Sequence, residues 1–167
     1  MPEEDIHTVE KQAWDDKWRA KNTPWDKSAP HGALLQLLKE SGTDDVPAIP
    51  KDGLALVPGC GKGYDVLLLA QRGLDATGLD VSPIAVEQAN EYLEEQQASS
   101  PLNHKTEVKL ASFFDWKRPI DGYSVIYDYT QDWEMVFQRD VKKEESRFDG
   151  DSFKQGREKI AVWKRRA

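Results

Sequence analysis

Residues 54–83 read LALVPGCGKGYDVLLLAQRGLDATGLDVSP, and this stretch decides the fold. It begins with four apolar residues without polar alternation, which is typical of a strand buried on both faces. The glycine turn PGCGKG follows, and the apolar residues after it predict a helix that ends near Gly73, a residue type favoured just beyond a helix. A second strand over Ala76–Asp80 then ends on an acid. The stretch therefore predicts one βαβ unit.

The glycine turn and the acid at the end of the second strand indicate a nucleoside site. Gly59, Gly61 and Gly63 let the backbone turn tightly and let a ligand approach it, and the next helix offers free N–H groups at its start. Asp80 lies 21 residues after Gly59, near the spacing of about 20 residues at which an acid accepts hydrogen bonds from ribose hydroxyls. The spacing G-x-G-x-G and the lack of a following arginine favour S-adenosylmethionine over NAD(P).

Composition limits the class of protein and of partner. A chain of 167 residues is long enough for one domain with a core and short for two. Its net charge of −7 argues against a nucleic-acid partner. The acidic N-terminus and the lack of a long apolar run predict a cytoplasmic protein without a membrane partner. One cysteine, Cys60, and three scattered histidines predict neither a disulfide nor a metal site.

The N-terminal segment is rich in tryptophan. Trp14 and Trp18 stand four residues apart, on one face of a helix predicted over Val9–Ala20. Proline in the tetrapeptide Thr23-Pro24-Trp25-Asp26 ends that helix. We interpret residues from about 9 to 41 as an aromatic lid, although the same rings could simply cover the core of the domain.

Further elements follow the first helix and the βαβ unit. His31–Ser41 predicts a short amphipathic helix, and Pro83–Gln97 predicts a longer one with Ser82 as its N-cap. Glu107–Leu110 is the predicted third strand. The pair Phe113-Phe114 comes directly after it, where aromatic side chains can flank an adenine ring.

The remaining strands complete an α/β pattern. Gly122–Tyr129 predicts a fourth strand, and its end places Asp128 and Tyr129 at the edge of the sheet where ligands bind. Trp133–Gln138 and Arg157–Lys164 predict an antiparallel hairpin. The expected fold is a Rossmann-like, mostly parallel sheet in three layers that ends in this hairpin.

With these segments assembled, the chain resembles the thiopurine S-methyltransferase-like family, particularly its thiol or halide methyltransferase branch. The motifs that carry the resemblance are Trp14-x-x-x-Trp18, TPWD at 23–26, VPGCGKGYDV at 57–66, ATGLDVSP at 76–83, SFFDW at 112–116, VIYDYT at 125–130 and GREKIAVWKR at 156–165. The glycine-turn motif is the most specific of them, and the others occur in the right order.

The resemblance implies a class I S-adenosylmethionine-dependent methyltransferase, a single domain over 1–167, that releases S-adenosylhomocysteine. The implied cofactor-binding residues are Trp14, Trp18, Trp25, Gly59, Gly61, Gly63, Asp80, Val81, Phe113, Phe114 and Asp128. The tryptophans would lie near the methionine end of the cofactor, Asp80 would hold the ribose, and the phenylalanines would border the adenine. Asp26, Asp128 and Tyr129 are candidates for orienting or deprotonating a small thiol acceptor.

The chain departs from this family after the fourth strand. Thr130 passes almost directly to the final hairpin, so the segment that would normally build one wall of the acceptor pocket is missing. Unpaired backbone groups at a sheet edge are costly, and we expect one of the last two strands to pair with the fourth, giving a sheet of about six strands. The protein would then be a monomer, whereas an exposed edge would allow a dimer.

Two functions of different class remain. The first is an enzyme that methylates a small thiol or a similar soft nucleophile. The second is a shortened, catalytically inactive form that binds only the cofactor or a protein partner.

Overall fold

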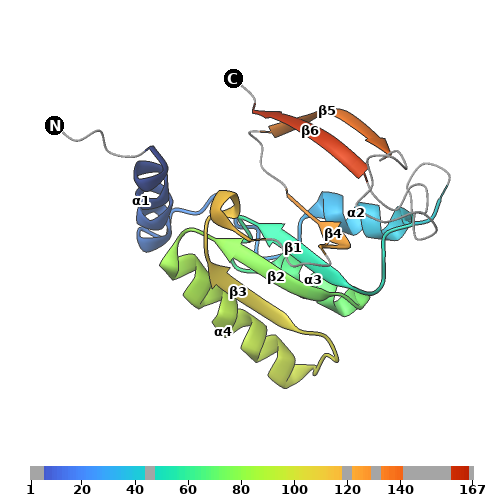
Figure 1. The fold of residues 1–167 in the computed structure, drawn as a ribbon. Helices are drawn as coiled ribbons and strands as arrows, with labels where there is room; N and C mark the ends of the chain where they lie inside the picture. The colour runs from blue at the N-terminus through green and yellow to red at the C-terminus, as the bar shows by residue number, and fades with distance from the viewer. Residues whose placement is uncertain (1–5, 44–47, 118–121, 129–132, 141–158, 166–167) are drawn as a thin grey trace. The chain divides into compact units, whose positions relative to one another are not determined.

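The computed structural model describes residues 6–43, 48–117, 122–128, 133–140 and 159–165. The chain divides into two compact units, Met1–Asp128 and Tyr129–Ala167, which are described separately. In chain order (Figure 1) the elements of the first unit are α1 (Ile6–Arg19), α2 (Gly32–Glu40), β1 (Leu54–Pro58), α3 (Tyr64–Arg72), β2 (Asp75–Asp80), α4 (Pro83–Ser99), β3 (Thr106–Leu110), the 3₁₀ turn η1 (Phe113–Asp115) and β4 (Val125–Ile126). The second unit contains β5 (Trp133–Asp140) and β6 (Lys159–Arg165).

The strands of the first unit form one parallel sheet of four strands in the order β3-β2-β1-β4. β1 pairs with β2 from Leu54 opposite Asp75 to Pro58 opposite Leu79. The predicted βαβ unit and the α/β class are confirmed. Because β1 and β2 are parallel, the glycine turn after one and the acid at the end of the other reach the same edge of the sheet.

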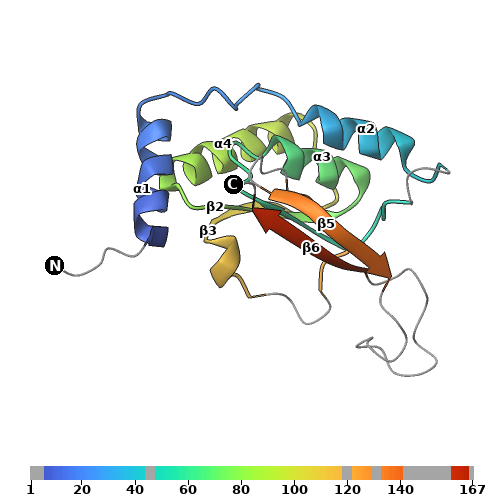
Figure 2. The ribbon, with the colours of Figure 1, turned by 90° about the horizontal axis from the view of Figure 1, so that it is seen from above.

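Helices α2, α3 and α4 share one core with the sheet, and Figure 2 shows them together on one side of the strands. Buried apolar side chains of all three helices and of β1, β2 and β3 make up this core, among them Leu34, Ala55, Val57, Val66, Leu69, Ala76, Ala89, Leu93 and Val108. Local signals set the ends of two helices. Gly73 adopts φ 115° at the end of α3, and the Ser82 hydroxyl accepts a hydrogen bond from the Ala85 N–H at the start of α4. Both predicted caps are confirmed.

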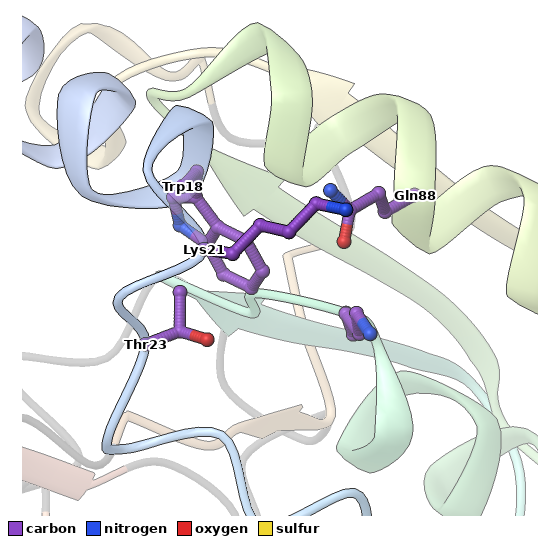
Figure 3. Close-up of a pocket in the computed structure, with 5 residues that line it drawn as sticks. Trp18, Lys21, Thr23 and Gln88 are labelled. Atoms are coloured by element: carbon purple, nitrogen blue, oxygen red, sulfur yellow. The ribbon is translucent and has the colours of Figure 1, made fainter.

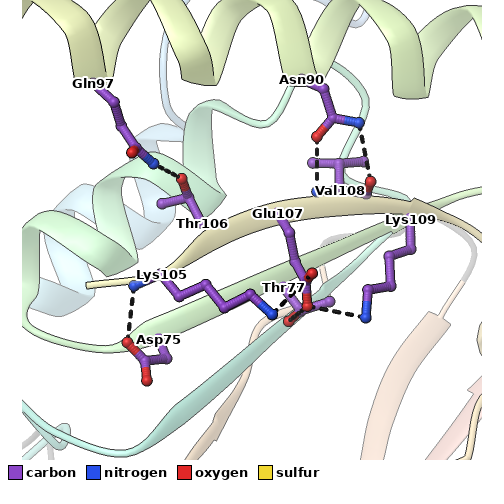
Figure 4. A network of polar contacts seen from close by, with 9 residues as sticks. All are labelled: Asp75, Thr77, Asn90, Gln97, Lys105, Thr106, Glu107, Val108 and Lys109. Carbon is purple, nitrogen blue, oxygen red and sulfur yellow. Dashed lines mark hydrogen bonds and ion pairs between the residues drawn. The ribbon is translucent and has the colours of Figure 1, made fainter.

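The edge strand β3 is fastened by side chains (Figure 4). The Asn90 side chain on α4 donates to the Val108 carbonyl and accepts from the Val108 N–H, both at 3.1 Å. The ammonium groups of Lys105 and Lys109 each lie 3.0 Å from a Glu107 carboxylate oxygen. Side chains therefore occupy backbone groups that an edge strand would otherwise leave unpaired.

The edge of the sheet at β4 differs from the prediction. The fourth strand is regular only over Val125–Ile126, although the N–H groups of Ser124 and Tyr127 still donate to β1. The expected pairing of a late strand with β4 is wrong, because β5 and β6 form a two-stranded antiparallel sheet of their own. A two-residue ladder on β4 offers few hydrogen bonds, whereas β5 and β6 pair from Trp133 opposite Arg165 to Asp140 opposite Lys159, with one register shift between Met135 and Phe137.

None of the helices in the described ranges combines the length and apolar character required to span a membrane.

Candidate functional site

The glycine turn after β1 has the conformation that the sequence predicts. Gly59, Gly61 and Gly63 adopt φ values of 59°, 51° and 77°, which disfavour any other residue type. The position of a Cβ on Gly59 would meet open space. A Cβ on Gly61 would lie 3.4 Å from the Trp18 ring. The turn therefore leaves room above Gly59 and carries an indole against Gly61.

Asp80 lies at the end of β2 and is tied to this turn. Its carboxylate accepts a hydrogen bond from the Gly61 N–H and another from the Ser82 N–H, both at 3.0 Å. The residue is only 8% exposed, and this burial raises the pKa of Asp80, while the backbone N–H groups of Ser82, Gly61 and Val81 oppose the rise. A carboxylate offers about four acceptor positions, so Asp80 keeps acceptor capacity for a ligand hydroxyl beside these N–H groups.

Three tryptophans surround the turn. Trp18 on α1 is 5% exposed, whereas Trp14 and Trp25 are exposed at the surface. Trp25 meets Trp14 and Trp18 edge to face, with ring centroids 5.1 and 6.2 Å apart. The structure thus gathers the three predicted rings into one cluster, which touches the site through Trp18. Their action as a lid stays a prediction.

A cavity of about 360 Å³ opens beside Trp18 (Figure 3). Its lining residues are Trp18 from α1, Lys21 and Thr23 from the segment after α1, Lys62 from the glycine turn and Gln88 from α4. In Figure 3 the Lys21 side chain extends across the cavity toward Gln88. Two ammonium groups, an amide and a hydroxyl beside an indole form a polar, positively charged pocket in a protein whose net charge is −7.

Asp26 stands beside this pocket and already has partners. Its carboxylate lies 3.7 Å from the Lys62 ammonium group and accepts a hydrogen bond from the Ser28 N–H at 2.8 Å. Asp26 therefore joins the segment after α1 to the glycine turn. No hydrogen bond or ion pair among the described residues joins it to Asp128.

The other predicted residues lie further along the chain. Phe113 and Phe114 meet edge to face at 5.9 Å, and Phe114 is 69% exposed. Val81 is half-buried between Asp80 and the cap of α4. The adenine role of the phenylalanines stays a prediction.

Asp128 follows β4, and Tyr129 lies outside the described residues. Asp128 is exposed, yet partial loss of hydration raises the pKa of its carboxyl group. Because the residue is exposed, water reaches this side chain and screens its charge.

Cys60 has a structural role within the turn. A Cβ on Gly78 would lie 2.6 Å from the Cys60 sulfur, so the thiol fills the space that this glycine leaves. Burial of the sulfur raises the pKa of Cys60 well above its usual value of 9.0, which disfavours the thiolate at neutral pH. In the described part of the chain, no group of three or more His, Cys, Asp or Glu side chains is arranged to hold a metal ion.

Sequence reasoning missed several residues around the site. Lys21, Lys62 and Gln88 line the cavity, but nothing in their spacing connects them. Asp15 on α1 hydrogen-bonds Ser82 beside Asp80. The sequence signal that could have identified Asp15 is its position three residues before Trp18, on the same side of the helix.

Known proteins resemble this chain over most of its length. The family model for thiopurine S-methyltransferase (TPMT) matches residues 9–131. The chain is 34% identical over 117 residues to "Probable thiol methyltransferase 2" of Arabidopsis thaliana. This alignment covers 70% of the present chain and 46% of that protein. It is 36% identical over 122 residues to "Thiocyanate methyltransferase 1" of Brassica oleracea, covering 73% and 49%. The chain thus spans about half the length of these curated relatives.

A solved structure shares the fold. Magnesium protoporphyrin IX methyltransferase from Synechocystis PCC 6803, with bound S-adenosylmethionine, superimposes with a TM-score of 0.53 at 18% identity. The match covers 77% of this chain and 63% of that one.

Proposed function

Because the chain belongs to the thiopurine S-methyltransferase family, we propose that it binds S-adenosylmethionine and transfers the methyl group to a small thiol or similar soft nucleophile. The observation that carries the proposal is the Asp80 carboxylate, fixed by the N–H groups of Gly61 and Ser82 beside the glycine turn. The names of the relatives support the acceptor class, since they include a probable thiol and a thiocyanate methyltransferase.

The residues at this edge of the sheet fit the cofactor. Asp80 has acceptor capacity left for a ribose hydroxyl, and the open space at Gly59 allows close approach of a ligand to the backbone. Trp18 would cover the methionine end, and Phe113 and Phe114 would border the adenine. When bound, S-adenosylmethionine supplies an electrophilic methyl group.

The chain must position the acceptor and favour its anionic form. A thiolate is reactive near neutral pH, so the reaction needs alignment of the nucleophile more than it needs an acid or a base. The cavity beside Trp18 is our candidate acceptor pocket. Its two ammonium groups, from Lys21 and Lys62, would lower the pKa of a bound thiol and favour its anion.

We assign different roles to the three catalytic candidates. Asp26 holds Lys62, so we assign it the positioning of that ammonium group and not the removal of a proton. Asp128 and Tyr129 remain proposed acceptor-orienting residues at the end of the fourth strand.

The proposal extends to the whole molecule. We infer one cofactor-binding domain over 1–167, with residues from about 9 to 41 as its lid, that works as a monomer in the cytoplasm without nucleic acid. Its partners would be the cofactor and a small acceptor.

Calorimetric titration with S-adenosylhomocysteine tests the cofactor site. We expect saturable one-to-one binding, and Asp80→Ala should weaken it by about ten- to a hundredfold, as expected for about 1–3 kcal/mol of lost charged hydrogen bonds. Asp75→Ala at the opposite end of β2 is the matched control and should bind like the wild type. No binding by a folded wild-type sample would reject the proposal.

A second assay separates enzyme from binding module. S-adenosylmethionine and a panel of thiols and thiocyanate are added, and the released S-adenosylhomocysteine is measured. Turnover with any acceptor supports the enzyme. Tight cofactor binding without turnover would favour the inactive form.

A further inference from the structure

A buried hydrogen bond joins the N-terminal helix to the start of α4. The Ser82 hydroxyl donates to the Asp15 carboxylate at 2.7 Å, across 67 residues of sequence. Asp15 is 8% exposed and Ser82 is fully buried. A buried carboxylate is costly unless it is paired, so this contact fixes the position of α1 sharply.

Asp15 carries its negative charge in this position. The hydrogen bond from Ser82 is the largest effect that lowers the pKa of Asp15, and the Arg19 guanidinium adds to it. The Arg19 Nη2 atom lies 2.7 Å from the second carboxylate oxygen and faces solvent. One oxygen of the Asp15 carboxylate thus accepts from Ser82 at the start of α4, and the other pairs with Arg19 on α1 itself.

Few other contacts hold α1 in place. Within residues 11–19 of this helix, only Asp15 and Trp18 are buried. Trp18 packs on Gly61. Asp15 and Trp18 are three residues apart and lie on the same side of the helix. Apart from an exposed ion pair between Lys11 and Asp115 at 4.0 Å, the described part of α1 is therefore anchored to the unit at one buried polar and one buried aromatic point.

Both points lead to Asp80. Asp15 binds the Ser82 hydroxyl, and the Ser82 N–H binds one oxygen of Asp80. Trp18 packs on Gly61, whose N–H binds the other oxygen. A closed ring of contacts thus connects α1 with the acid and with the glycine turn.

We propose that Asp15 is a positioning residue that holds α1, and with it Trp18, against the cofactor site. Docking of α1 and binding of the cofactor then favour one another, and by linkage each strengthens the other by the same factor. This inference rests on the proposed function for its ligand. The docking of α1 itself does not depend on that ligand.

Hydrogen exchange in the full chain tests the docking without any ligand. Asp15→Ala should speed amide exchange within 6–19 by at least about tenfold, because α1 loses one of its two anchors. Asp16→Ala is the matched control, since the Asp16 side chain is exposed and accepts a hydrogen bond from Gln12 on its own helix. Exchange in Asp15→Ala equal to that in Asp16→Ala would overturn the proposal.

The affinity for S-adenosylhomocysteine then tests the coupling. We expect Asp15→Ala to raise the dissociation constant about three- to thirtyfold, and Asp15→Asn, which keeps an acceptor for Ser82, to raise it less. The ligand should also slow exchange within 6–19 in the wild type. An unchanged dissociation constant in a folded Asp15→Ala variant would reduce Asp15 to a purely structural role and overturn the coupling.

A double variant guards against indirect effects. Ser82→Ala removes the same hydrogen bond and also weakens the cap of α4. If the two residues act through their mutual bond, adding Asp15→Ala to Ser82→Ala should change the exchange of α1 no further. Additive effects would contradict the inference. If the wild type binds no S-adenosylhomocysteine, the proposed function fails, while the exchange measurements still decide the docking.

Discussion

The two sides of β1 differ in how firmly they are built. On one side β2 pairs with β1 from Leu54 to Pro58, and its Ala76 belongs to the shared core. On the other side β4 pairs only at Ala55 and Leu56, and Ile126 is 53% exposed. The firm side carries the residues proposed to hold the cofactor. The weakly paired side leads to Asp128, shortly before the family match ends at residue 131.

The two sides of β1 would then serve two different requirements of a methyltransferase, cofactor binding and acceptor binding. The proposed cofactor site uses local turns and a continuous ladder, so it can persist in a chain whose matched part spans about half the length of its relatives. The proposed acceptor-orienting residues Asp128 and Tyr129, in contrast, follow the weakly paired β4. We therefore expect cofactor binding to tolerate changes at β4, and activity to be more sensitive to them.

The largest expected effect is on stability, from Leu69→Ala in α3. Leu69 is fully buried in the core, and the substitution should lower the free energy of unfolding by about 2–5 kcal/mol through lost contacts and a cavity. Ile126→Ala on β4 should cost below about 1 kcal/mol, because its side chain is half exposed. Urea denaturation of both variants measures the contrast. Equal losses would show that the two sides of β1 are equally firm.

Gly78→Ala in β2 should have the next largest effect. A Cβ there would lie 2.6 Å from the Cys60 sulfur, 2.8 Å from a Val66 methyl group and 3.0 Å from a Val108 methyl group. Overpacking of this kind costs about 1–3 kcal/mol. Adding Cys60→Ala should restore part of the loss, since it removes the closest of the three contacts. Full stability of Gly78→Ala in thermal unfolding would mean that the firm side can rearrange.

The smallest expected effect is a pH dependence. Burial raises the pKa of Asp80 above its ordinary value of 3.8. The folded protein thus binds an extra proton between pH 3.8 and the raised value, so the contribution of Asp80 to the free energy of unfolding falls as pH rises through that window. The ionised carboxylate accepts ribose hydroxyls best, and stabilisation by S-adenosylhomocysteine should therefore grow over the same window.

Melting temperatures with and without S-adenosylhomocysteine, from pH 4 upward, would show this dependence. Asp80→Asn should flatten it. Asp128→Asn, on the weakly paired side, should leave it unchanged. If Asp128→Asn flattened the pH dependence instead, we would infer that the ligand binds nearer to β4.

Local sequence alone predicted the centre of this protein. The apolar run, the glycine turn and the acid of residues 54–83 specify a βαβ unit, because each signal acts within a few residues. Gly73 and Ser82 cap their helices as predicted, since capping depends on hydrogen bonds to the nearest turn. The motif order also indicated the family, which the match over residues 9–131 shows.

Tertiary structure decided what joins distant segments. The hydrogen bond between Ser82 and Asp15 spans 67 residues, and neither residue type predicts the other. The cavity lined by Lys21, Lys62 and Gln88 depends on how α1 and α4 approach the glycine turn. The sheet of six strands failed as a prediction because a local hairpin satisfied β5 and β6 without β4. Short-range signals set the elements and the cofactor motif, whereas packing between elements set the partners of Asp80, Asp26 and Trp18.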